Sequence, residues 1–203
     1  MIKETLKKDS EALDWTDTNS FILSYGHFIN FFNKPESITE SDFIIGAHFT
    51  YGWMPTILDF RAKELEDCVE ILNKVKNKQD ITDKDFNKLI NAINGSLVGV
   101  SKLLHFIDPQ KYAIWDSNVI EYLKLNEGGK WGVKDIEAYE SYLGILEDVS
   151  RDDGTMKIIR KNIGSNFIGT VSDLRIIEMV MFLKGRKIQQ ELKRKKAKKK
   201  KPT

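Results

Sequence analysis

Apolar residues recur every three or four positions along most of the chain, which is the spacing of amphipathic helices. We therefore expect helices over residues 3–14, 19–33, 56–76, 82–93, 117–124, 134–150 and 172–184, and another that carries Lys102. Residues 43–53 form an aromatic segment, whereas residues 155–163 fit either a helix or an extended piece. Alternation of apolar and polar residues is sparse, so the pattern predicts an all-α fold.

Several of the expected helices carry residues that typically begin or end a helix. Thr82 precedes one of them, and Asn94-Gly95 ends it with a pair that favours the left-handed conformation. Asp116 is placed to cap the helix that follows it, and Ser172 is placed to cap the last helix. These positions predict where the helices begin and end.

The composition is that of an ordinary soluble globular protein. The chain has 203 residues, of which 41% are hydrophobic and 31% charged, enough for a sizeable core. We expect one helical domain over residues 1–185 and a monomer. No apolar run approaches the ~20 residues that span a bilayer, and residues 1–10 lack the apolar core of a signal peptide.

The sequence favours neither a disulfide nor a metal site. Its one cysteine, Cys68, excludes an intramolecular disulfide and suits a reducing compartment. The three histidines, His27, His48 and His105, do not cluster with it at the spacing of zinc ligands. We therefore expect no metal or other cofactor, no membrane association and a cytoplasmic location, at the nucleoid if the protein binds DNA.

Positive charge is concentrated in residues 193–201. This segment carries eight positive charges, and subtracting them from the net charge of +2 leaves −6 for the rest of the chain. Such a block repels itself, so we expect a disordered, flexible tail over residues 186–203 that contacts DNA with low specificity. A solubilising segment and a localisation signal are the alternative interpretations of this tail.

Two glycines precede the segment that contains the candidate catalytic residues. Gly95 and Gly99 permit tight turns, and a glycine that leads into a helix leaves backbone amides pointing outward. Such amides bind a phosphate without side chains, which makes Gly99 and Ser101 candidate phosphate-binding residues.

A lysine and an aspartate follow these glycines. Lys102 is expected in the first turn of a helix, where the positive potential favours the neutral amine that a Schiff base requires. Asp116 follows an extended apolar piece, residues 112–115, and is placed as an N-cap. A lysine and an aspartate held in this way can form an imine and move its protons, which is the chemistry of base excision.

Two motifs of this stretch resemble the catalytic core of the helix-hairpin-helix DNA glycosylases: Gly99-Val100-Ser101-Lys102 and Trp115-Asp116-Ser117-Asn118-Val119. The resemblance covers residues 82–125 and implies an all-α protein that flips a damaged or modified base out of DNA. It also implies that Lys102 is the nucleophile of a glycosylase with lyase activity, and that Asp116 activates the nucleophile or stabilises the sugar cation. Ser101 stands where the family has a second glycine, and Asn118 where it often has a histidine.

Ordinary structural roles compete with these catalytic ones. An aspartate before a helix is most often a cap, and a lysine in a first helical turn is most often solvated. Both roles are compatible for Asp116, because capping also holds a carboxylate rigidly. His105 lies three residues after Lys102 and shares a helix face with it, either as a base-binding residue or as a partly buried histidine.

The aromatic segment supplies the other candidate base-binding residues. A flipped base needs flat faces to stack on and polar atoms that read its edge. Tyr51, Trp53 and His48 offer both, and packing in the core between helices is the alternative role for them. The sequence thus predicts a DNA N-glycosylase, with or without lyase activity. The alternatives are a non-catalytic helix-hairpin-helix DNA-binding module and a helical interaction protein without a nucleic-acid role.

Overall fold

The computed structural model describes residues 1–13, 19–54, 56–61, 65–163 and 171–199. Helices account for the regular structure of these ranges, apart from one isolated β-bridge, so the predicted all-α class is confirmed. The chain folds into two compact units. Unit 1 consists of Met1–Asp14 and Trp115–Thr203, and unit 2 consists of Trp15–Ile114. The single domain expected over residues 1–185 stays a prediction.

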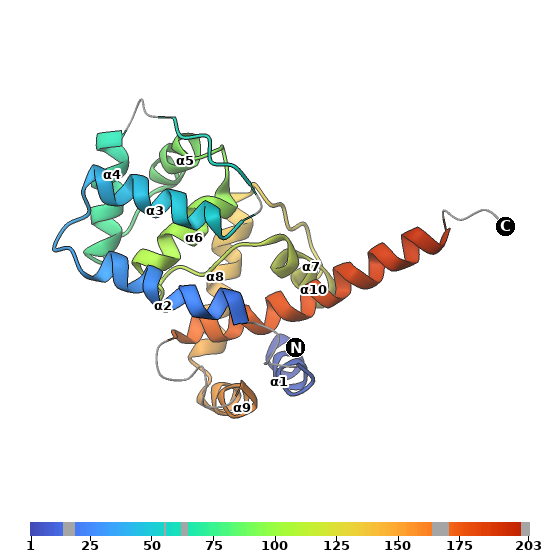
Figure 1. Ribbon diagram of the computed structural model, residues 1–203. Coiled ribbons are helices and arrows are strands. Elements are labelled where there is room, and N and C mark those ends of the chain that lie inside the picture. The colour runs from blue at the N-terminus through green and yellow to red at the C-terminus, as the bar shows by residue number, and fades with distance from the viewer. Residues whose placement is uncertain (14–18, 55, 62–64, 164–170, 200–203) are drawn as a thin grey trace. The chain divides into compact units, whose positions relative to one another are not determined.

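Unit 2 is built around one central helix. Its helices are α2 (Asn19–Asn33), α3 (Glu40–Gly52), α4 (Leu65–Lys76), α5 (Asp83–Ala92) and α6 (Leu97–Ile107). Helix α6 contacts the other four (Figure 1), and every one of its residues except Val98 is buried. A helix that is apolar on all sides is typical of a core helix, and α6 therefore carries the core of unit 2.

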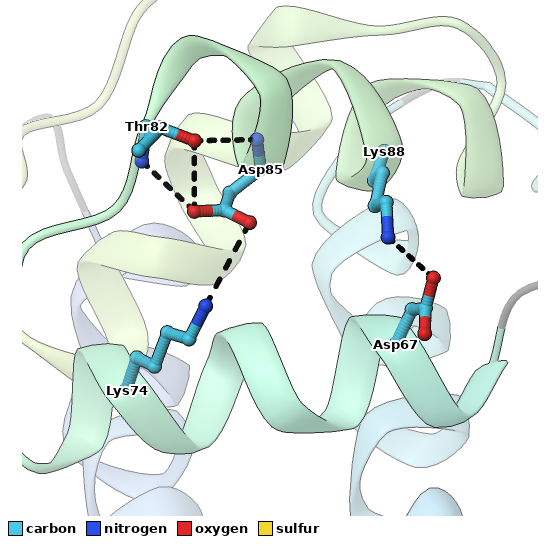
Figure 2. Close-up of polar contacts among 5 residues, drawn as sticks. All are labelled: Asp67, Lys74, Thr82, Asp85 and Lys88. Carbon is cyan, nitrogen blue, oxygen red and sulfur yellow. Dashed lines mark hydrogen bonds and ion pairs between the residues drawn. The ribbon is translucent and has the colours of Figure 1, made fainter.

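Capping boxes and ion pairs fix the helices around α6. The Thr82 hydroxyl accepts a hydrogen bond from the backbone amide of Asp85, whose carboxylate accepts one from the Thr82 amide. Figure 2 shows the same Asp85 carboxylate facing Lys74 of α4 at 3.9 Å, and Lys88 of α5 paired with Asp67 of α4. These two pairs brace α4 against α5.

Unit 1 is also built around one helix, α10 (Asp173–Lys199). This helix contacts the four others of the unit: α1 (Ile2–Glu11), α7 (Ser117–Asn126), α8 (Ile136–Ser150) and α9 (Asp153–Ile163). Asp9 of α1 links this helix to α7 and α10, because it accepts a hydrogen bond from Tyr122 of α7 and pairs with Lys184 of α10 at 2.7 Å. Residues 155–163, which were predicted to be either helical or extended, are helical.

The helix expected over residues 56–76 begins later, at Leu65. Residues 56–61 are not helical, because their backbone pairs with the turn between α5 and α6. Asn94 donates its backbone amide to the carbonyl of Asp59, and its side chain donates to the carbonyl of Ile57 at 2.8 Å. The Arg61 amide donates to the Ala92 carbonyl at 2.9 Å. These long-range hydrogen bonds therefore take the place of the bonds that a local helix would form.

The expected flexible tail is helical as far as the structure describes it. Helix α10 does not end at Lys184 but continues to Lys199, and residues 200–203 lie outside the described residues. Residues 186–199 contain neither glycine nor proline and consist mostly of strong helix formers. Repulsion between like charges one turn apart costs only about 0.2–0.5 kcal/mol per pair. Helix propensity therefore outweighs the self-repulsion from which a disordered tail was expected.

Candidate functional site

Asp116 is the N-cap of helix α7, as predicted. Its backbone is extended (φ −143°, ψ 153°), and its Oδ1 accepts hydrogen bonds from the backbone amide of Asn118 at 2.7 Å and from the Asn118 side chain at 2.8 Å. The residue is only half-buried. The carboxylate is thus oriented by two donors from one residue, at a position that is not fully buried.

The residue before Asp116 anchors this helix start in the core of unit 1. Trp115 is fully buried and lies 5.1 Å from Tyr142 and 6.0 Å from Tyr139, measured between ring centroids. Burial raises the pKa of Tyr142 well above its ordinary value, and the negative charge of Glu178 adds to this increase. The charge of Asp116 contributes in the same direction. The phenol therefore stays protonated, with two carboxylates within electrostatic range.

Helix α10 supplies a buried ion pair to the same unit. Arg175 donates a hydrogen bond to Glu178, three residues further along the helix, and the two side chains are 10% and 1% exposed. Both members of this pair therefore lie inside unit 1. Removing one member of such a pair leaves a buried charge without compensation.

Helix α10 also touches the start of α7 next to Asp116. A Cβ atom at position 185 would lie 1.9 Å from the carbonyl oxygen of Asn118, so only glycine allows this approach. One turn further, Gln189 donates a hydrogen bond to the carbonyl of Ser117 at 3.1 Å. Gly185 and Gln189 therefore fix α10 against the segment that presents Asp116.

The turn between α5 and α6 differs from the predicted hairpin. Asn94 and Gly95 adopt positive φ angles of 58° and 60°, which confirms the left-handed ending predicted there. The prediction of a turn at Gly99 is wrong, because α6 begins at Leu97 and Gly99 lies inside it. Glycine is needed at position 99 because a Cβ atom would lie 2.5 Å from the Tyr51 hydroxyl.

The candidate phosphate-binding residues are engaged within unit 2. The Gly99 amide donates to the side chain of Ser96 at 3.1 Å, and the fully buried Ser101 donates to the Val98 carbonyl at 2.9 Å. Asn94, in the turn itself, donates its amide to Asp59. Phosphate binding at Gly99 and Ser101 stays a prediction, but the amides of Asn94 and Gly99 already have acceptors.

Lys102 lies in the second turn of α6 and is buried, with 8% of its surface exposed. The expected position in the first turn is wrong, since the helix begins five residues before the lysine. The potential of the helix end falls off within one turn, so it no longer favours a neutral amine here. Lys102 belongs to unit 2 and Asp116 to unit 1. The nucleophilic role of Lys102 stays a prediction.

His105 is fully buried and uses both ring nitrogens. Nδ1 lies 2.7 Å from the carbonyl of Tyr112, so it carries the proton and donates. In the neutral ring Nε2 then accepts from the Tyr25 hydroxyl at 2.9 Å. Tyr25 is thus a hydrogen-bond partner of His105 that no motif in the sequence indicated.

The three aromatic candidates have different surroundings. Tyr51 is buried and donates its hydroxyl to the Ile93 carbonyl at 3.3 Å. Trp53 is half-buried, donates to Ser24 at 2.7 Å and lies 6.3 Å from the Tyr25 ring, so it joins the His105 cluster. His48 is exposed, and its Nδ1 lies 2.8 Å from the Ile44 carbonyl. Base binding by these residues stays a prediction.

The structure therefore brings Trp53, Tyr25 and His105 together in unit 2. At the start of α7 it places residues that the motif did not single out. Asn118 was noted only as a departure from the family pattern, and Gly185 and Gln189 carry no signal in the sequence. Within the described ranges, no group of three or more acidic, histidine or cysteine side chains is placed to hold a metal ion. None of the helices described combines the length and apolar character of a membrane span.

No protein-family model, no curated protein and no solved structure matches this chain.

Proposed function

We propose that the protein is a DNA N-glycosylase that acts on a damaged or modified base, with Asp116 as its catalytic residue. The observation that carries the proposal is the geometry of the Asp116 carboxylate, which two Asn118 donors orient while the residue stays half-buried. The resemblance of the surrounding motif to helix-hairpin-helix glycosylases supports the same role.

The chemistry requires a fixed negative charge beside the sugar. The bond between the base and C1′ breaks with its electron pair moving to the base, which takes up a proton, and water adds hydroxide to C1′. A carboxylate stabilises the positive charge that develops on the sugar and accepts the proton of the attacking water. The Asn118 donors hold Oδ1, so the second oxygen of Asp116 is the one assigned to this task.

Replacing Asp116 by asparagine tests the proposal, because asparagine retains the capping oxygen and removes the charge. Duplexes that each carry one deaminated, alkylated or oxidised base serve as substrates. We expect excision of at least one of them, and a loss of about 100-fold or more in Asp116→Asn. Asp135→Asn is the matched control, since Asp135 caps α8 in the same way and should keep full activity. Full activity of Asp116→Asn, or no excision of any lesion, contradicts the proposal.

Borohydride reduction on DNA with an abasic site tests the lyase variant. A covalent adduct that disappears in Lys102→Ala assigns the nucleophile to Lys102. Burial of this lysine in α6 favours excision by water alone, and we therefore expect no adduct.

A second function, DNA binding without catalysis, is supported by the exposed basic residues of α10, among them Lys193, Arg194, Lys195 and Lys196. In that case Asp116 only caps α7. Salt-sensitive DNA binding without excision, unchanged in Asp116→Asn, would favour this alternative.

A further inference from the structure

We infer that Lys193 and Lys196 form a phosphate-binding face on α10 that seats the DNA backbone beside Asp116. The inference rests on the proposed function, because it identifies how the substrate of that site is held. The basic segment was expected to be a flexible tail, but it belongs to a helix whose position relative to α7 is fixed by Gly185 and Gln189.

The position of each cation follows from helix geometry. Gln189 marks the face of α10 that meets α7, because it donates to Ser117, the residue next to Asp116. At about 100° per residue, Lys193 and Lys196 lie within roughly 40° of Gln189, and with a rise of 1.5 Å they follow it by about 6 and 10 Å. The same rotation places Arg194 and Lys195 about 120–140° away, on other faces.

The charges on this face favour a polyanion as its ligand. Lys193 and Lys196 are exposed, and none of the ion pairs found within the described ranges involves them. Glu191, the one acidic residue between positions 186 and 196, lies about 200° from Gln189, on the opposite side of the helix. On this face, residues 186–196 of α10 therefore offer a phosphate two cations, while the acidic residue of the same stretch lies on the other side of the helix.

Two double variants of equal charge change test the inference: Lys193→Gln with Lys196→Gln, and Arg194→Gln with Lys195→Gln. The probe is a fluorescent duplex of about 20 base pairs with normal bases, titrated between about 50 and 200 mM salt. For the first variant we expect about tenfold weaker binding and a salt slope smaller by about two. For the second we expect less than about threefold weaker binding and an unchanged slope. Circular dichroism checks that both variants keep their helices.

Equal losses in the two variants overturn the inference, because a diffuse basic tail does not distinguish helix faces. Full-length protein that ignores DNA at low salt but binds anionic vesicles or an acidic protein also overturns it. The probe carries no lesion, so this result is independent of the excision assay. A face-specific loss of binding without any excision would keep the inference and contradict only the catalytic proposal.

Discussion

Helices α6 and α10 hold corresponding positions as the central helices of their units, but they expose very different surfaces. Helix α6 is buried along its whole length apart from Val98, so even its lysine, histidine and serine lie inside unit 2. Helix α10 is buried over its first half and carries a run of exposed cations over its second half. Of these two helices, only α10 exposes a run of charged side chains to solvent.

The same difference separates the two halves of the motif. A residue in the first half of the motif, such as Lys102, is part of a packed core. Asp116, in the second half, is half-buried at a helix end that α10 supports. Of these two residues the aspartate is thus the more exposed, and the helix that supports its end of α7 lies far away in the sequence.

The strongest test of the comparison truncates one leucine in each helix. Leu104→Ala in α6 should lower the free energy of unfolding by about 2–5 kcal/mol, because it leaves a cavity in a buried site. Leu192→Ala in the exposed half of α10, where the side chain is 43% exposed, should change it by less than about 0.5 kcal/mol. Urea titration of both variants measures this contrast. Equal losses would show that α10 packs along its whole length.

A somewhat smaller effect is expected where α10 meets α7. Gly185→Ala places a methyl group against the Asn118 carbonyl and should cost about 1–3 kcal/mol of stability. Gly144→Ala in α8 is the control, since nothing lies within 4 Å of its Cβ position, and it should stabilise by up to about 1 kcal/mol. Thermal unfolding compares the two. A neutral Gly185→Ala would remove the fixed contact on which the α10 phosphate face depends.

The smallest expected effect concerns the stability of the protein at low pH. Hydrogen bonding from the Thr82 backbone lowers the pKa of the Asp85 carboxyl, with the lysines nearby adding to this. The stabilisation is complete above the unfolded pKa of about 3.9 and is lost as the pH falls through the lower folded value. Asp85→Asn should therefore be less stable than the wild type at pH 7, and this difference should shrink below about pH 4. Asp83→Asn, at an exposed position of the same helix, is the control for urea titrations across this range.

Local signals predicted much of the fold correctly. The helix over residues 19–33 and the caps at Thr82, Asp116 and Ser172 are confirmed, because each depends on residues within one or two turns. The left-handed pair Asn94-Gly95 is confirmed for the same reason. Capping and periodicity are local properties, so a single sequence contains them.

Contacts between distant residues account for what the sequence could not predict. Residues 56–61 lose their expected helix to backbone partners in the α5–α6 turn. Gly99 resembles a turn glycine, but its conformation is helical and its need for glycine comes from Tyr51. The two hydrogen bonds that Asn118 donates to Asp116 join residues two positions apart, so they are local. The contacts of Gly185 and Gln189 with α7 join distant residues, and the sequence could not predict them.

Unit 1 is formed by two pieces of chain that are far apart in the sequence, and this affects how the protein folds during synthesis. Unit 2 is continuous, so it can begin to fold once Ile114 has left the ribosome. Helix α1 must wait much longer, because Ser10 accepts its hydrogen bond from Asn162, which lies 152 residues later. Asp9 likewise waits for Lys184. The nascent chain therefore carries α1 without its native neighbours while unit 2 folds, and the Asp116 site is completed only when α10 emerges.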